Sequence, residues 1–142
     1  MEIIYKLYKA ENFFYRIHLT PISIFIRAGM RLVFSCDIPY KTQIGSGTRF
    51  PHHALGIVIH PEAKIGKNCR ILHGVTIGGK SGHKQLPVIG NNVFIGANSV
   101  VMGPIKIGDN AVIGAGSVVL HDVKENTVVS GVPAKEINKK NG

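Results

Sequence analysis

The chain has 142 residues, of which 44% are hydrophobic, so it can bury one substantial core but is too short for two ordinary domains. Lysine and arginine outnumber aspartate and glutamate by 17 to 8, which favours anionic partners such as a phosphate-bearing cofactor or an anionic membrane surface. Nucleic acid is not expected, because the aromatic residues cluster in the first fifty positions beside aliphatic ones and are not interleaved with basic residues.

Residues 1–35 are predicted to form one or two amphipathic helices. Apolar residues alternate there with Lys6, Lys9 and Arg16, and Pro21 suits a helix start. We expect this segment to cap the open end of the domain that follows, which would otherwise expose a strand edge. The alternative is a basic helix that lies on a membrane surface.

No targeting or membrane-spanning segment is expected. The first residues include Glu2 and Glu11 and lack the apolar core of a signal peptide. The apolar stretch 21–34 contains Arg27 and Arg31 and is shorter than the roughly 20 residues that cross a bilayer. The two cysteines have no metal-binding spacing. A cytoplasmic protein is the simplest interpretation.

An aliphatic residue recurs every six positions from Ile59 to Val119. Ten of these eleven positions hold Ile or Val, and the exception, His83, lies in the stretch GGKSGHKQLP, whose composition predicts a protruding loop. A shorter series with the same period ends at Phe50 and is shifted by three residues. The break between the two series contains the adjacent His52 and His53.

This period of six fits neither an α-helix nor a hairpin meander, but it fits one short strand and one turn per hexapeptide. Three hexapeptides make a triangular coil of 18 residues in which each recurring aliphatic side chain points inward. We therefore predict an all-β solenoid over residues 36–137, preceded by the helical cap 1–35 and followed by a basic tail 138–142.

Three stretches of the repeat region resemble a known family. They read CDIPYKTQIGSGTRFPHHALGIVIHPEAKIGKNCRILHGVTIGG, PVIGNNVFIGANSVVMGPIKIGDNAVIGAGSVVL and VVSGVPAKEI. They are similar to the hexapeptide-repeat acyltransferases, and among these to serine acetyltransferase and its sugar-modifying relatives. The resemblance implies a left-handed parallel β-helix, a hand that the period alone does not supply because parallel crossovers are generally right-handed. It also implies transfer of acetyl from acetyl-CoA to a hydroxyl of serine or of a sugar or polysaccharide.

The resemblance further implies a histidine general base that an aspartate orients. The aspartate opens a D-I dipeptide, here Asp37, and the base follows fifteen residues later, which gives His52; His53 is the alternative. His73 is expected one coil above His52 and, with His83, is a possible substrate contact. A half-buried histidine bonded to the backbone explains His73 equally well.

For acetyl-CoA, the matching positions are Gly78, Gly79, Ala97 and Ala115 along the pantetheine arm and Lys135 at the nucleotide phosphates. The glycines are explained equally well as residues that tight corners require. No metal is expected, since a thioester is already an activated acyl group.

Two other functions stay open. One is a non-catalytic structural solenoid. The other is a zinc enzyme like the γ-class carbonic anhydrases, which also carry a His-Gly motif but need a further histidine where this chain has Asn68. The acceptor is open too, because Gln85 and Leu86 stand where serine acetyltransferase has an Arg-His pair.

The resemblance implies a homotrimer with active sites between subunits. Apolar residues that flank the inward positions would leave stripes on the outside of the coil, and such patches mark interfaces. These residues are Val58, Leu72, Val100, Met102, Val112, Val118 and Leu120. A hexamer is not expected, because the helical part is only about 35 residues long.

Overall fold

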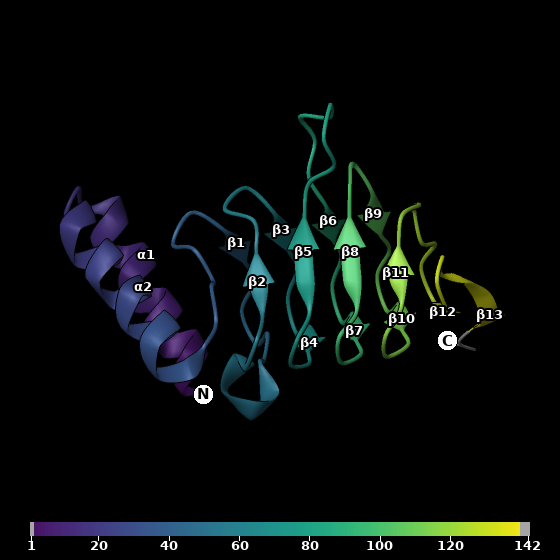
Figure 1. The fold of residues 1–142 in the computed structure, drawn as a ribbon, viewed down its shortest axis with the longest axis horizontal. Helices are drawn as coiled ribbons and strands as arrows, with labels where there is room; N and C mark the ends of the chain where they lie inside the picture. Colours follow the sequence, from purple (N-terminus) through teal and green to yellow (C-terminus); the bar gives the residue numbers. More distant parts are fainter. Residues whose placement is uncertain (1, 140–142) are drawn as a thin grey trace.

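The computed structural model describes residues 2–139 and begins with two helices that lie together at one end of a coil of short strands (Figure 1). Helix α1 (Ile3–Arg16) and helix α2 (Thr20–Phe34) pack against each other, which confirms the predicted helical segment. Neither helix of this described part is long and apolar enough to cross a membrane.

Helix α1 covers the first turn of the coil with one face. Its buried residues Ile4, Tyr8 and Glu11 recur at helical spacing. The Tyr8 hydroxyl donates a 2.6 Å hydrogen bond to the Thr42 carbonyl of the coil. The helix therefore lies where a strand edge would otherwise meet water. The division into parts at residue 35 remains a prediction.

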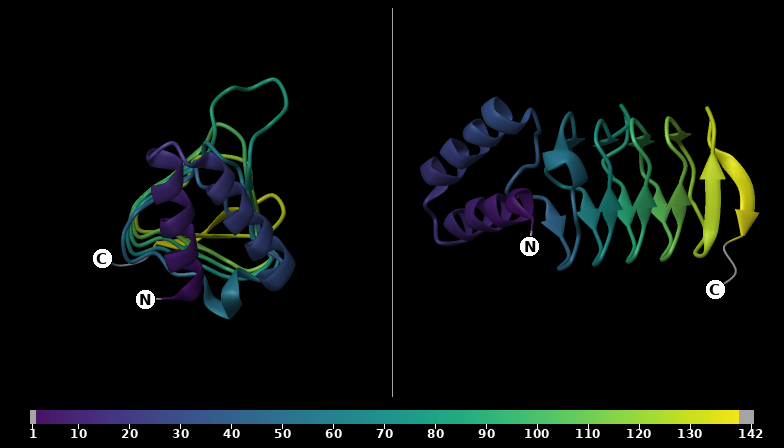
Figure 2. Two further views of the ribbon diagram at one scale, coloured as in Figure 1. Left: turned by 90° about the vertical axis from the view of Figure 1, so that its left-hand side faces the viewer. Right: turned by 90° about the horizontal axis from the view of Figure 1, so that it is seen from below.

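The strands form three parallel sheets that the chain visits in turn. The first sheet holds β1 (Gln43–Ile44), β3 (Lys64–Ile65), β6 (Val88–Ile89) and β9 (Lys106–Ile107). The second sheet holds β2 (Val58–Ile59), β5 (Thr76–Gly78), β8 (Val100–Met102) and β11 (Val118–Val119). The third sheet holds β4 (Arg70–Ile71), β7 (Phe94–Ile95), β10 (Val112–Ile113) and β12 (Thr127–Ser130). The chain thus winds as a three-sided coil, seen along its axis and from the side in Figure 2.

The strand register matches the predicted coil length. Ile59 pairs with Ile77, 18 residues further on. Across the three-residue break, Ile44 pairs with Ile65 at a spacing of 21, and across the protruding loop Ile65 pairs with Ile89 at 24. The break and the loop therefore add residues at corners and leave the stacking of the coils intact.

The recurring aliphatic residues form the core of the coil, as predicted, because side chains alternate across a strand and every second one points inward. The buried members are Ile38, Phe50, Ile59, Ile65, Ile71, Ile77, Ile89, Ile95, Val101, Ile107, Ile113 and Val119.

The far end of the coil differs from the prediction. Strand β13 (Lys135–Lys139) turns back and pairs antiparallel with β12, so regular structure continues past the predicted boundary at Ile137. The added strand covers the last exposed edge of the third sheet, which is the physical reason for ending a solenoid in this way. The rest of the predicted basic tail, 140–142, lies outside the described residues.

Gly45, at the corner directly after β1, allows two neighbouring coils to approach each other closely. A Cβ on Gly45 would lie 2.5 Å from the carbonyl carbon of Gly66 in the next coil, whereas a Cβ on Gly78 would meet no atom within 4 Å. Gly45→Ala is therefore expected to destabilise the fold by about 1–3 kcal/mol, as overpacking does. Gly78→Ala is the matched control, and equal urea-unfolding midpoints for the two variants would contradict the expectation.

Candidate functional site

The three-residue break folds as a short turn, Pro51–Ala54, that presents both histidines to solvent. His52, His53 and Ala54 all have left-handed backbone conformations, with φ of 58°, 54° and 59°. Such values are unusual for residues other than glycine and concentrate at functional sites. The buried Ala54 anchors the turn, and its carbonyl accepts a 2.9 Å hydrogen bond from the Ile57 amide.

The two histidine rings point to different neighbours. His52 lies edge-on to His73, with ring centroids 5.3 Å apart, which confirms the expected position of His73 one coil above. His53 instead stacks on Phe34 at the end of α2, with centroids 5.7 Å apart. The His73 Nδ1 atom is buried and has no hydrogen-bond partner within residues 2–139. Backbone bonding, the alternative explanation for His73, is therefore not seen at this nitrogen.

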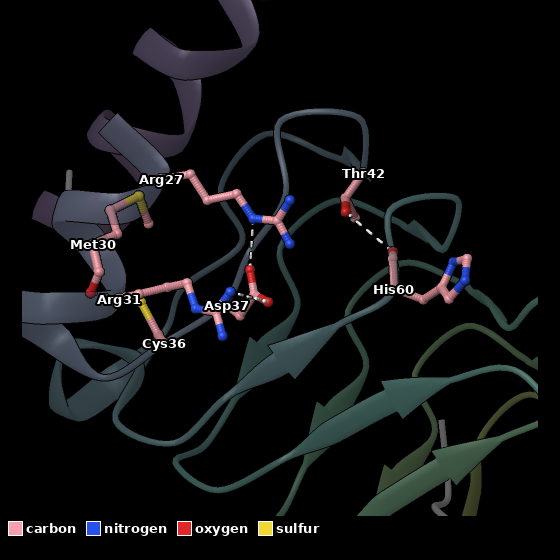
Figure 3. A network of polar contacts seen from close by, with 7 residues as sticks. All are labelled: Arg27, Met30, Arg31, Cys36, Asp37, Thr42 and His60. Carbon is pink, nitrogen blue, oxygen red and sulfur yellow. Dashed lines mark hydrogen bonds and ion pairs between the residues drawn. The ribbon is translucent and has the colours of Figure 1, made fainter. Parts of the chain in front are cut away.

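The Asp37 carboxylate is held by two arginines of α2 (Figure 3). The Arg27 Nε donates to Asp37 Oδ1 at 2.7 Å, and Arg31 Nη1 lies 3.8 Å from Oδ2. The hydrogen bond to Asp37 is the largest cause that raises the pKa of Arg27. Among the described residues, no hydrogen bond joins Asp37 to His52 or His53, so the predicted orienting contact is not formed in this arrangement.

Asp37 nevertheless lies beside the strand that leaves the histidine turn. Its backbone pairs with Val58: the Asp37 amide donates to the Ile57 carbonyl at 2.8 Å, and the Ile59 amide donates to the Asp37 carbonyl at 2.9 Å. The backbone of Asp37 therefore lies beside strand β2, which begins six residues after His52, although the two side chains make other contacts.

The predicted cofactor residues separate into three places. Ala97 and Ala115 lie on the corner between the third and second sheets, which we call the histidine corner and which comprises residues 51–57, 72–75, 96–99 and 114–117. Gly78 and Gly79 lie at the opposite end of the second sheet, at the base of the loop. Lys135 is exposed at the start of β13, beyond the last coil.

Backbone hydrogen bonds join the turns of the histidine corner into one ladder. The Gly74 amide donates to Leu55 at 2.8 Å, the Asn98 amide to His73 at 2.9 Å, and the Gly116 amide to Ala97 at 2.8 Å. The predicted catalytic turn and the two predicted cofactor alanines therefore share one continuous corner. His83 is not part of it, since it is exposed on the loop after β5.

One hollow of the described chain lies away from the histidine corner. It measures about 620 Å³, lies between α1 and the coil corner after β1 and β3, and contains none of the predicted site residues. Within residues 2–139, no group of three or more His, Cys, Asp or Glu side chains is arranged to hold a metal ion. On the histidine corner, the side chains of His52 and His53 are exposed in the single chain.

Sequence analysis missed two residues near Asp37. In the sequence, Arg27 stands out only as a charge within an apolar stretch, and Glu11 only as a charge that argues against a signal peptide. Glu11 is fully buried, and its burial raises its pKa to about 8 against the opposing effect of Arg27. The sequence does hold one signal for the role of Arg27. Arg27 and Arg31 stand four residues apart in an apolar stretch, so they lie on the same face of a helix and could hold one anionic group together.

Comparison with known proteins gives one consistent result. Residues 87–121 match the family described as "Bacterial transferase hexapeptide (six repeats)". The serine acetyltransferase of Mycobacterium tuberculosis is 42% identical over 109 residues, which are 75% of this chain and 47% of that protein. The chain is a serine acetyltransferase-like hexapeptide-repeat protein.

Solved structures extend the likeness of this hexapeptide-repeat protein to the helices. Serine acetyltransferase from Brucella abortus strain S19, solved in complex with coenzyme A, matches with a TM-score of 0.89 and 34% identity over 96% of this chain and 55% of that one. Soybean serine acetyltransferase complexed with serine matches with a TM-score of 0.87 and 38% identity over 94% of this chain and 56% of that one. The chain thus spans about half the length of these relatives.

Proposed function

We propose that this chain is an acetyl-CoA-dependent O-acetyltransferase and that its coil is the left-handed β-helix implied by its family resemblance. The observation that carries the proposal is the histidine corner, where two exposed histidines and the predicted cofactor alanines share one backbone ladder. The solved relatives with coenzyme A and with serine support the same activity.

In the proposed reaction, a neutral histidine accepts the proton of the acceptor hydroxyl while the hydroxyl oxygen attacks the thioester carbonyl. The new C–O bond forms as the C–S bond breaks, and the histidine returns its proton to the departing thiolate. His52 is the proposed base by its spacing from Asp37. His53, the next residue of the same turn, is the second candidate and would be the base if the alignment from Asp37 were shifted by one residue.

The histidine corner fits the pantetheine arm of acetyl-CoA. Ala97 and Ala115 are small, so an extended amide chain could approach the backbone closely, and a Cβ on Gly78 would meet open space at the other end of the same sheet. Lys135 would meet the nucleotide phosphates. His73, with its unpartnered Nδ1, is the proposed contact to the acceptor or the acyl oxygen, and His83, exposed on the loop after β5, is a further candidate substrate contact.

A thiol-release assay with acetyl-CoA tests this function against serine, amino sugars and oligosaccharides as acceptors. Serine is the first acceptor to test, although Gln85 and Leu86 replace the Arg-His pair of the serine site. We expect thiol release with at least one acceptor and no loss of rate after dialysis against a chelator. Release with none would favour the structural solenoid, and a zinc-restored loss would favour a carbonic-anhydrase-like metal enzyme.

We also propose a homotrimer that completes the histidine corner with a wall from a second subunit. Five of the predicted outward apolar residues lie in or directly after strands of the second sheet, and two of these, Val58 and Leu120, are 47% and 43% exposed. Light scattering is expected to give about three times the 15.4 kDa chain. A mass of one chain or of six chains would refute it.

Contact of the helices with a membrane surface remains a proposal. Large apolar side chains on α2 are exposed, with Phe25 at 80%, Leu32 at 86% and Val33 at 72%. The exposed Arg31 of the same helix accompanies them, as basic residues do in helices that bind anionic lipid surfaces. Co-sedimentation with anionic but not neutral vesicles is the corresponding measurement.

A further inference from the structure

Glu11 is a buried carboxyl group for which the fold supplies no hydrogen bond. The residue is 0% exposed, and both of its carboxyl oxygens lack a partner within the described residues. Its backbone is fixed against α2, since the buried Ser23 hydroxyl donates a 2.6 Å hydrogen bond to the Glu11 carbonyl. Arg27 lies one helical turn after Ser23, so it occupies the same side of α2.

A buried carboxyl group must either keep its proton or pair with a cation, because an isolated buried charge is very costly. Burial raises the pKa of Glu11 to about 8, nearby Arg27 lowers it and nearby Asp37 raises it. Tyr8 on α1 and Cys36 after α2 also face this carboxyl, and each has its own pKa raised in part by it. Of the neighbours named here, only Arg27 is a cation that could pair with an ionised Glu11.

Arg27 therefore has two neighbouring carboxyl groups, those of Asp37 and Glu11, and it is hydrogen-bonded to only one of them. In the structure it donates to Asp37, while Glu11 has no partner. The second contact to Asp37, from Arg31, spans 3.8 Å and involves a side chain that is 63% exposed, so it holds the carboxylate weakly. Moving Arg27 to Glu11 would exchange one ion pair for another and leave Asp37 with only that weak contact.

We propose that Glu11 is a positioning residue for acetyl transfer: it is the second partner of Arg27, and exchange of Arg27 from Asp37 to Glu11 releases the Asp37 carboxylate to orient the histidine base. The proposal rests on the proposed function. In the arrangement seen here Glu11 keeps its proton and Arg27 holds Asp37. In the released arrangement the Glu11 proton has passed to solvent, and the ionised carboxylate pairs with Arg27.

Activity of Glu11→Gln and of the double variant Glu11→Gln with Arg27→Gln tests the exchange. Glutamine keeps the shape of Glu11 but cannot attract Arg27 as an anion, so kcat should fall roughly tenfold at unchanged KM for acetyl-CoA, less than the 10²–10⁴-fold loss of a base. Removing Arg27 as well frees Asp37 and should restore most of kcat. The exposed Glu125→Gln is the matched control. Losses that simply add in the double variant would overturn the proposal.

A second readout does not depend on acetyl transfer. Carbon-13 NMR titration of the Glu11 carboxyl should show that Asp37→Asn lowers its pKa, because the released Arg27 can then pair with Glu11. The decrease should be much smaller when Arg27 is also replaced by Gln, and an equal decrease in both backgrounds would overturn the exchange. The expected difference without thiol release in the wild type would support the exchange and refute the proposed function.

Discussion

Replacing His52 by alanine is expected to lower the turnover of acetyl transfer by about 10²–10⁴-fold, the usual cost of removing a positioned general base. The acceptor hydroxyl is a poor nucleophile until its proton is taken, and His52 is exposed on a turn whose backbone is fixed by the buried Ala54. Turnover is measured by thiol release at saturating acetyl-CoA, and an unchanged circular dichroism spectrum shows that the coil is intact.

His53→Ala decides between the two histidines. If His52 is the base, His53→Ala removes a stacking partner of Phe34 and should cost far less than His52→Ala. If His53→Ala is inactive while His52→Ala turns over normally, the base is the ring on the Phe34 side, and the alignment from Asp37 is off by one. His83→Ala is a loop substitution that separates a substrate contact from a base, since a contact residue raises KM for the acceptor more than it lowers kcat.

The coil could be predicted from sequence because its rule is local. Every sixth residue is aliphatic, and each strand is only two to four residues long from β1 to β12, so one pattern specifies strand, turn and burial together. The insertions at the histidine turn and the protruding loop were visible as breaks in the same pattern. Strand β13 was not predicted, because the repeat has already ended and pairing there depends on the free edge of β12.

Only those site residues that lie within the hexapeptide repeat could be placed from the sequence. His52 and His73 come together because they lie at matching corners of successive coils. The partner of Asp37 could not be found in this way, since Arg27 lies on a helix outside the repeat, and its distance from Asp37 depends on how α2 packs against the coil. The buried position of Glu11 likewise depends on which face of α1 packs against α2. An amphipathic pattern alone predicts that a charged residue such as Glu11 lies on the exposed, polar face.

Glu11 should make the stability of this fold depend on pH in a direction opposite to that of most carboxyl groups. Its pKa is raised from 4.5 to about 8 by burial, so the folded chain binds a proton that the unfolded chain has released between these values. Stability therefore falls as pH rises from 4.5 to about 8, and the total loss over this range is on the order of 5 kcal/mol. This is a large share of the net stability of an ordinary domain.

Glu11→Gln removes this proton linkage while it keeps the size of the side chain. Urea unfolding at about pH 5 and pH 8, at one fixed chain concentration because the proposed trimer would make stability concentration-dependent, should show a smaller decrease with pH in the variant than in the wild type. Histidines and other groups titrate in both proteins, so the difference between the two slopes isolates Glu11. Equal slopes would mean that Glu11 is ionised in the folded chain at both pH values, already paired with Arg27, and that Asp37 is then free without any exchange.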